Sequence, residues 1–411
     1  MATVEKIALA GSSEAPSVGA APSDARQSPA RLLFLVTEDW YFWSHRLPVA
    51  RAARDDGFDV LVATRVRDHG ERIRAEGFRL CPLPWRRSGD GIIGAARALA
   101  AIMALYRRER PQIVHHVALK PVLFGAAAAR LAFLHAATRP ATIGAVMGLG
   151  SGLLPRTPIG RLAGAALRQA LRVATANGRI IVQNPEDRAA LIGLGVAPAR
   201  LVVIRGSGVD IGHFAPLPEL TGPPLTIALV ARMLRSKGVL DVVDAVRRLR
   251  AQGMAVELVL AGPTDPDNRD SLDETTLRGL CAEPGVEWLG RVEDVREIWR
   301  RAALAVMPSF YGEGVPKALL EAAACGRAII ASDMPGCREA VRHGETGLLV
   351  PPHDIAALAA AIAELAGDPA RRRRMGEAGR ALVEREFGDA GVAHATLVLY
   401  RTLLRERQRA R

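Results

Sequence analysis

Two glutamates eight residues apart could carry chemistry in the stretch PSFYGEGVPKALLEAAACGRAIIASDMPG, residues 308–336. Glu313 precedes a helix that Pro316 is placed to begin and Gly326 to end, and Glu321 lies within that helix. The helix follows an apolar strand, so its first backbone N–H groups face the ligand-binding edge of a parallel sheet and can bind an anion. We expect one carboxylate to reach a transferred group and the other a more distant hydroxyl. The alternative is a capped surface helix with two solvated glutamates.

A second, basic motif reads VARMLRSKG at residues 230–238 and follows the first strand of the second half of the chain. Arg232 and Lys237 flank a loop that opens onto a helix. Two cations at such a turn suit a diphosphate, because they would stabilise the charge that grows on a leaving nucleotide. Loops of this composition are common, so the prediction depends on the glutamate motif as well.

Together with the downstream TGLLVPP (346–352), these motifs resemble the retaining glycosyltransferases of family 4. That family has the GT-B architecture, in which two doubly wound, Rossmann-like α/β domains face a cleft. The resemblance is dense over 225–352, and the order of elements fits over 31–400. It implies a retaining glycosyltransferase that takes a sugar from a nucleotide diphosphate sugar, preferably a UDP-sugar. Neither a metal nor another cofactor is expected if cationic side chains hold the diphosphate.

The resemblance also implies roles for individual residues. Arg232 and Lys237 would hold the donor diphosphate, and Glu321 would bind the ribose hydroxyls. Glu313 would contact the donor sugar, and it forms the expected catalytic set with the two cations and a histidine. The other donor-side residues surround the helix start or lie in two loops expected beside the base: Gly314, Val315, Pro316, Lys317, Gly262, Arg291 and Val292.

In the first half of the chain, IVHHVALKP (113–121) ends an apolar strand and begins a helix. The resemblance implies a histidine beside the sugar at such a strand end. Neighbouring strand residues point to opposite faces, so only one of His115 and His116 can face the cleft, and His116 is the first choice. Lys120 is expected as a further cation near the acceptor. A histidine in the core or at a helix cap is the alternative.

The stretch DWYFWSH (39–45) places four aromatic residues together in a chain that is only 4% aromatic. We expect it to form the loop between the first strand and the first helix. Many members of the family have glycines near the donor phosphates at this point, whereas this loop has none, so we expect it to face the acceptor. Aromatic faces stack on sugar rings. Trp40, Trp43 and His45 are therefore predicted on the acceptor side, with the other rings packed inward.

The rest of the chain must position these residues. Short apolar strands alternate with helices, which is typical of parallel sheets covered on both faces. We predict a disordered tail over 1–30, a first α/β domain over 31–212 and a Pro-rich linker over 213–224. A second α/β domain over 225–386 would bind the nucleotide sugar. A last helix over 387–411 is expected to cross back to the first domain.

The net charge of +12 suits an anionic partner: nucleic acid, an anionic membrane or a phosphorylated substrate. Neither zinc-finger spacing nor an RNA-binding aromatic signature occurs in the sequence, so nucleic acid is not expected. The four cysteines form no Cys-x-x-Cys pair, and neither a secretory signal nor an apolar run of about 20 residues occurs. We therefore expect a cytoplasmic protein with free thiols. Apolar, arginine-tipped helices such as 91–110 predict peripheral contact with the inner membrane surface.

The expected acceptor is a lipid-linked or other saccharide in cell-surface polysaccharide synthesis, such as that of capsule or exopolysaccharide. A nucleotide-sugar 2-epimerase of similar architecture is the alternative function, because it would use carboxylates in the cleft but no acceptor. A non-enzymatic nucleotide-binding or membrane-surface protein is a third hypothesis, and the intact carboxylate and cation motifs disfavour it.

Overall fold

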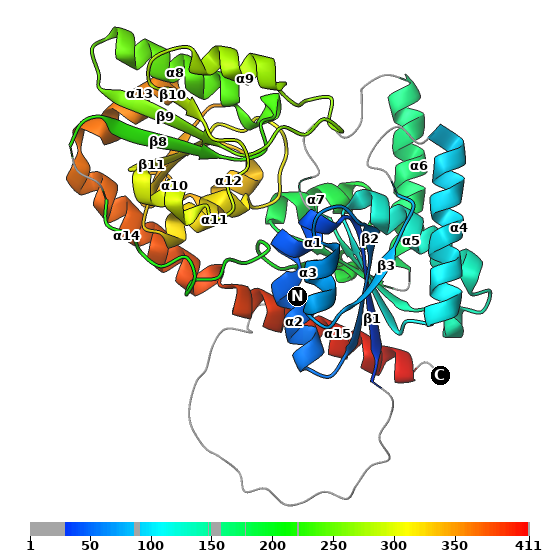
Figure 1. Cartoon of the computed structure of the whole chain (residues 1–411). Helices are drawn as coiled ribbons and strands as arrows, with labels where there is room; N and C mark the ends of the chain where they lie inside the picture. The colour runs from blue at the N-terminus through cyan, green and yellow to red at the C-terminus, as the bar shows by residue number, and fades with distance from the viewer. Residues whose placement is uncertain are drawn as a thin grey trace, which may run out of the picture.

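The structure is a computed structural model that describes residues 29–85, 91–146, 148, 158–176, 178–219 and 222–409. The tail expected over 1–30 lies outside these residues, apart from 29 and 30. Two α/β domains are visible, each built around one parallel sheet with helices on both faces (Figure 1). The predicted fold class is therefore confirmed.

The first sheet, in the described residues, has seven strands in the order β3-β2-β1-β4-β5-β6-β7. Its strands are β1 (Arg31–Glu38), β2 (Asp59–Arg65), β3 (Arg79–Pro82), β4 (Ile113–Val117), β5 (Ala141–Ala145), β6 (Gly178–Val182) and β7 (Leu201–Val203). Its helices are α1 (Asp39–His45), α2 (Leu47–Asp55), α3 (Gly70–Ala75), α4 (Gly91–Glu109), α5 (Leu119–Ala132), α6 (Pro158–Thr175) and α7 (Pro185–Gly193), with short 3₁₀ turns η1 (Ala136–Thr138) and η2 (Pro198–Arg200).

The second sheet has six described strands in the order β10-β9-β8-β11-β12-β13. They are β8 (Leu225–Val230), β9 (Val256–Ala261), β10 (Val286–Trp288), β11 (Leu304–Met307), β12 (Ala328–Ser332) and β13 (Gly347–Val350). The 3₁₀ turn η3 (Arg235–Lys237) precedes the helices α8 (Val239–Ala251), α9 (Glu274–Cys281), α10 (Arg296–Arg301), α11 (Lys317–Ala324), α12 (Pro335–Ala340), α13 (Ile355–Gly367) and α14 (Pro369–Glu386), and the chain ends in α15 (Asp389–Arg409). In both sheets the strand order reverses beside the first strand, which is where open α/β sheets bind ligands.

Strand β1 shows why these apolar segments become buried strands. Phe34 packs with α2 and α15 on one face of the sheet, whereas Leu35 packs with α4 on the other face. β1 pairs in parallel with both neighbours, with Phe34 opposite Val62 and His115. Because both faces are covered, every side chain of such a strand except those at its ends is removed from water.

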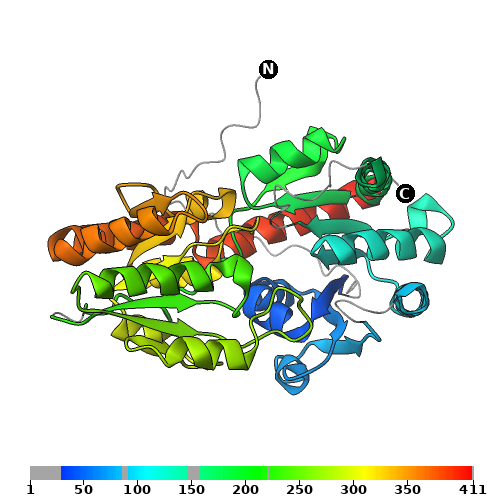
Figure 2. The same cartoon turned by 90° about the horizontal axis from the view of Figure 1, so that it is seen from above.

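The chain crosses between the domains twice, and the two crossings lie together. The Val209 N–H donates to the Phe387 carbonyl at 2.9 Å, and the Asp389 N–H donates to the Val209 carbonyl at 3.1 Å. Gly208 has φ +81°, and a Cβ there would lie 2.6 Å from the Asp389 Cα, so this close approach requires glycine. Beyond the crossing, α15 packs along α2 of the first domain. Figure 2 shows this last helix, in red, running from the second domain into the first.

The Pro-rich segment expected as a linker over 213–224 is attached to the second domain over its described part. Phe214 is buried in the core of that domain, and the Leu217 N–H donates to the Cys325 carbonyl at 3.1 Å. Glu219 forms an ion pair with the buried guanidinium of Arg372 on α14. The passage between domains therefore occurs near Val209, before this segment.

Ala118, directly after β4, has a backbone conformation that normally requires glycine, with φ +82° and ψ 163°. A non-glycine residue in this region stores about 1–3 kcal/mol of strain. Replacing Ala118 with glycine is expected to raise the free energy of unfolding by roughly 1 kcal/mol, after allowance for the greater freedom of glycine in the unfolded chain. Urea denaturation measures the change.

Ala126→Gly, within α5, is the matched control for this substitution. It adds the same freedom to the unfolded chain but relieves no strain, so it is expected to cost about 1 kcal/mol. If both variants lose stability equally, Ala118 is not strained.

Candidate active site in the interdomain cleft

A cavity of about 890 Å³ lies between the two domains, at the carboxyl ends of β1, β8 and β11. The second domain contributes the turn after β8 and the segment that leads from β11 into α11. The first domain contributes one side of α1, the end of β6 and the crossing segment. The lining of this cavity includes Trp40, Ser44, His45, Gln183, Ser207, Arg232, Ser236, Lys237, Glu313, Gly314, Val315, Pro316, Lys317 and Glu321.

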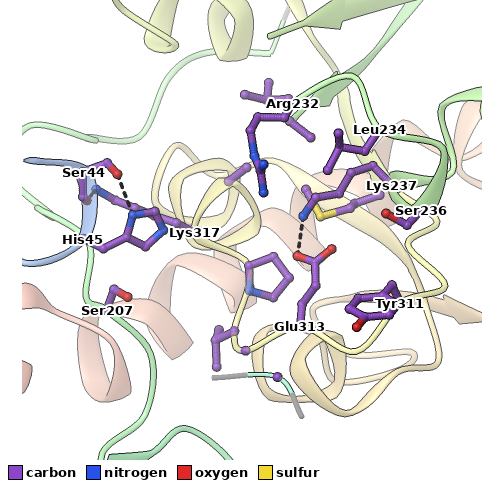
Figure 3. A pocket seen from close by; sticks show the side chains of 18 of the residues that line it. Ser44, His45, Ser207, Arg232, Leu234, Ser236, Lys237, Tyr311, Glu313 and Lys317 are labelled. Carbon is purple, nitrogen blue, oxygen red and sulfur yellow. Dashed lines mark hydrogen bonds and ion pairs between the residues drawn. The ribbon is translucent and has the colours of Figure 1, made fainter. Parts of the chain in front are cut away.

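Lys237 and Glu313 meet in the middle of the cavity (Figure 3). The Lys237 Nζ lies 2.5 Å from the Glu313 Oε2, and the Ser309 hydroxyl lies 2.7 Å from the other carboxylate oxygen. Lys237 ends the turn η3, and Gly238 follows it with φ +72°. A Cβ at Gly238 would lie 2.3 Å from the Pro308 carbonyl oxygen, so glycine lets the lysine turn pack directly against the exit of β11. The two motifs singled out in the sequence therefore share one site.

The segment that carries Glu313 is held by a residue of the first domain. The side-chain oxygen of buried Gln183 accepts a hydrogen bond from the Val315 N–H at 2.9 Å. Neither Gln183 nor Ser207, which reaches the same cavity from the crossing segment, was predicted. Gln183 directly follows β6, so the rule that ligand sites form after parallel strands could have identified it.

Helix α11 directs its amino terminus into the cavity. Pro316 takes the cap position and Lys317 begins the helix. Within the described residues no backbone carbonyl accepts from the amides of Lys317 and Ala318, which are therefore available to an anion. The Lys317 Nζ donates to the Ser44 carbonyl at 2.5 Å, which joins the start of α11 to α1 of the first domain.

Glu321 lies one turn further along α11, on the same wall of the cavity. Its nearest cation is the Lys317 Nζ, 3.8 Å away. Burial raises the pKa of Glu321 to about 7, although the charge of Lys317 acts in the opposite direction. An ionised Glu321 can accept hydrogen bonds from two hydroxyl groups of a ligand.

Arg232 connects the cation motif to both domains. Its guanidinium forms an ion pair with Asp265, in the loop after β9, and lies 5.4 Å from the centre of the Trp40 ring. Asp267 in the same loop forms ion pairs with Arg65 and Arg67 of the first domain. This loop therefore closes one end of the cleft.

The aromatic stretch DWYFWSH forms helix α1, so the prediction of a loop was wrong. Trp40, Tyr41, Ser44 and His45 line the cavity, because residues four apart on the helix lie on the same side. Trp43 lies on another side, where its ring contacts the Arg72 guanidinium at 4.4 Å. The acceptor-side prediction for Trp43 is corrected accordingly. Asp39 starts the helix from a buried position and accepts from the backbone amides of Arg67 and His69.

His116 does not face the cleft, which corrects its assignment to the catalytic set. Both histidines of β4 are buried. The His116 Nε2 lies 2.9 Å from the Tyr106 hydroxyl on α4, and the His115 Nδ1 lies 2.6 Å from the Tyr400 hydroxyl on α15. The two side chains do point to opposite faces, but helices cover both. Burial lowers the pKa of His116 to about 3, so its ring is neutral.

Four other predicted site residues lie away from the described wall of the cavity. The Lys120 Nζ lies 5.4 Å from the centre of the Trp85 ring, which is buried on the face of the first sheet that α4 covers. The Gly262 N–H donates to the Gly290 carbonyl, so the two loops expected beside the base bind each other. Arg291 forms a 3.1 Å ion pair with Asp68, and Val292 packs against the core of the second domain. No cluster of three metal-ligating side chains occurs in the described part of the chain.

A substitution separates the structural role of His116 from a catalytic one. Tyr106→Phe removes the hydroxyl and leaves the His116 Nε2 buried without its partner. We expect the free energy of unfolding to fall by about 1–3 kcal/mol. The transfer kinetics should be unchanged, because neither side chain reaches the cavity. Denaturation together with kcat/KM for both substrates tests this, and a kinetic defect with unchanged stability would return His116 to the active site.

The fold and the cavity define a two-domain α/β protein of GT-B architecture, with a cationic cleft that suits a diphosphate. Residues 224–368 match the model of the group 1 glycosyl transferases, and residues 31–142 match that of the glycosyl transferase 4-like domain. The two matches together cover more than half of the 411 residues. The chain therefore belongs to the group 1, 4-like glycosyl transferases, as the motifs predicted.

Curated proteins that resemble this chain include a sugar-phosphate synthase and a glycosyltransferase. The chain is 36% identical over 184 residues to alpha-maltose-1-phosphate synthase of Mycolicibacterium smegmatis, a match covering 43% of this chain and 47% of that protein. It is 32% identical over 182 residues to the putative colanic acid biosynthesis glycosyltransferase WcaL of Salmonella typhimurium, covering 42% and 44%. The chain thus spans about half the length of these curated relatives. The crystal structure of Anabaena HepE in complex with UDP-glucose has the same fold, with a TM-score of 0.69 and 18% identity over 91% of this chain and 99% of that one.

Proposed function

We propose that this protein transfers a sugar from a UDP-sugar to a lipid-linked or other saccharide acceptor in cell-surface polysaccharide synthesis, with retention at the anomeric carbon. The observation that carries the proposal is the convergence of Lys237, Arg232 and the amino terminus of α11 on one cavity that also holds Glu313 and Glu321. Cations and backbone N–H groups at one point suit a diphosphate, and carboxylates beside them suit hydroxyl groups.

The choice of donor is supported by the family and by the structural relative. HepE, which has the same fold, was crystallised with UDP-glucose. In this chain the diphosphate would lie between Lys237 and the free amides of α11, and Glu321 would accept from the ribose hydroxyls. The positive charges would stabilise the departing nucleotide, which is how such sites lower a barrier without a covalent intermediate.

The retaining reaction needs the acceptor hydroxyl to attack the anomeric carbon from the face that the diphosphate leaves. The bond from that carbon to the phosphate oxygen breaks, the bond to the acceptor oxygen forms, and the acceptor proton passes to the departing phosphate. Glu313 is already bonded to Lys237 and the Ser309 hydroxyl, so we assign it to positioning the sugar. The 2-epimerase alternative receives no support from the relatives named above.

We propose further that no metal is required, because Lys237, Arg232 and α11 supply the positive charge at the diphosphate. Transfer is expected to be unchanged within about twofold after EDTA treatment and dialysis, since the site holds the diphosphate with its own cations. Initial rates with and without added Mg²⁺ or Mn²⁺ measure this. Loss of activity with EDTA and its recovery with one of these ions would refute the metal-independent site.

We propose that the protein contacts the membrane surface through the start of α4, where the Ile92 and Ile93 side chains are 90% and 70% exposed. No helix in the described part of the chain is long and apolar enough to cross a membrane. An exposed apolar pair on a strongly basic protein suits the surface of an anionic bilayer, where a lipid-linked acceptor would be found. Co-sedimentation with anionic vesicles should fall in an Ile92→Glu, Ile93→Glu variant and persist in Val398→Glu, which alters an exposed apolar residue on α15.

The experiment that tests the proposed function is a donor screen. Nucleotide release is followed over a panel of UDP- and GDP-sugars, with a membrane extract as acceptor. Release that requires both a UDP-sugar and the extract supports the proposal, and the configuration of the product tests retention. A changed sugar without nucleotide release would instead favour the epimerase.

A further inference from the structure

His45, at the end of α1, presents an imidazole ring to the cavity in a fixed orientation. The ring stacks on Tyr41, with centroids 4.2 Å apart and planes within 4°. The Ser44 hydroxyl lies 2.6 Å from the Nδ1 atom. Figure 3 marks this contact with a dashed line. Within the described part of the chain no hydrogen bond engages the Nε2 atom, although the ring lines the cavity. One nitrogen is therefore used to hold the ring and the other is available to a ligand.

The surroundings of His45 are cationic. Its neighbour Ser44 accepts from Lys317 through its carbonyl, which brings the ring beside the start of α11. Burial lowers the pKa of His45 well below its usual value, and the charges of Lys317, Arg46, Lys237 and Arg232 lower it further. The carboxylates of the cavity are already engaged, Glu313 by Lys237 and Glu321 by Lys317. The ring is thus neutral and lies in a positive field that suits an anionic ligand.

The Ser44 hydroxyl decides which nitrogen of the neutral ring carries the proton. It can donate to the Trp40 carbonyl at 2.8 Å, in which case the Nδ1 atom must carry the proton and donate to it. When the hydroxyl instead donates to Nδ1, the proton resides on Nε2 and faces the cavity. An anion in the cavity favours this second arrangement, because only a donor can bond a phosphate oxygen.

We propose that the His45 Nε2–H donates a hydrogen bond to a diphosphate oxygen of the nucleotide sugar, with Ser44 as the residue that sets its tautomer. The inference rests on the proposed function and moves His45 from the acceptor side, where the sequence placed it, to the donor side. It also gives helix α1 a role in donor binding that no motif in the sequence indicated.

Binding of UDP and of uridine to wild-type protein and to three His45 variants tests the proposal. His45→Ala is expected to weaken UDP binding by about ten- to a hundredfold, the usual effect of losing a hydrogen bond to a charged group. Uridine binding, measured by ligand-observed NMR, should be unchanged because uridine has no phosphate. His45→Gln should recover most of the affinity, because its amide N–H can reach the position of Nε2, whereas His45→Asn reaches only that of Nδ1. Trp43→Phe, on the side of α1 away from the cavity, is the matched control.

The outcomes separate the inference from the function on which it rests. If wild-type protein binds no nucleoside diphosphate, the proposed function itself fails. If wild-type binds UDP and His45→Ala binds it equally well, His45 does not contact the diphosphate. A loss seen only with the intact UDP-sugar would assign the ring to a sugar hydroxyl and overturn the proposal. An equal loss of affinity for UDP and for uridine would mean that His45 only shapes the cavity, which would overturn the proposal. Thermal unfolding of each variant identifies a folding defect.

Discussion

Replacing Lys237 with alanine is expected to lower kcat/KM for sugar transfer by about a hundredfold to a thousandfold, the usual effect of removing one group that stabilises developing charge. The Lys237 Nζ lies 2.5 Å from Glu313, in the cavity that the first residues of α11 also line. Its loss removes a positive charge from the leaving diphosphate and also releases Glu313. Steady-state kinetics with the donor and acceptor varied separately measures the effect, which should appear in kcat as well as in the donor KM.

Arg235→Ala is the matched control for Lys237. Arg235 belongs to the same turn η3 and carries the same charge, but its side chain is exposed to solvent. Its removal changes the net charge of the protein by the same amount and should leave the kinetics within about twofold of wild type, since a solvated charge outside the site is screened. Equal losses in both variants would mean that overall charge, and not the position of Lys237, determines activity.

Glu321→Gln is expected to make the protein more stable while impairing donor binding. The raised pKa of Glu321, about 7 against a usual 4.5, means that folding favours the protonated carboxyl. The stabilising contribution of that protonated form is complete below the unfolded pKa and is lost as the pH rises through about 7. A neutral glutamine avoids this loss, so its advantage over wild type should grow from roughly 1 kcal/mol at pH 5 to roughly 3 kcal/mol at pH 8.5.

Chemical denaturation across this pH range measures the difference. Glu377→Gln, at an exposed position on α14, is the control, because the Glu377 carboxylate stays hydrated in the folded state. Its removal should not give a stability gain that grows with pH. UDP binding should fall in Glu321→Gln, because an amide offers one acceptor oxygen where the carboxylate offers two. A variant that loses UDP affinity but shows no stability gain at pH 8.5 would mean that folding does not raise the pKa of the Glu321 carboxyl, so that its ionisation costs the folded protein nothing.

The parts of the site that could be predicted are those that local sequence determines. Lys237, Glu313 and Glu321 each occur just after a strand of the second sheet or in the helix that follows it, so the strand pattern alone brings them to one edge. The alternation of short apolar strands with helices also predicted the two α/β domains. β7, Leu201–Val203, is too short for its alternation to be visible, and it follows a 3₁₀ turn rather than a helix.

The parts that could not be predicted depend on contacts between distant segments. The position of Gln183 after β6 could have placed it at the cleft, but its hydrogen bond to Val315 joins the two domains, and no local pattern predicts that contact. His116 was misplaced because the alternation of β4 does not show that α4 covers the face to which it points. Helix α1 was misread as a loop because aromatic residues favour strands and carry little helix propensity, whereas here the Phe42 side chain packs into the core as part of a helix.

The paired crossing at Val209 and Gly388 has a mechanical consequence. Two chain segments that hold each other through backbone hydrogen bonds act as one pivot, so the domains can rotate about it, whereas sliding would break both bonds. The contacts of Lys317 with Ser44 and of Val315 with Gln183 lie across the cleft and must separate on opening. Opening would therefore break the contact that holds the Glu313 segment and the contact that brings His45 close to α11. The two domains would form one complete site only in the closed arrangement.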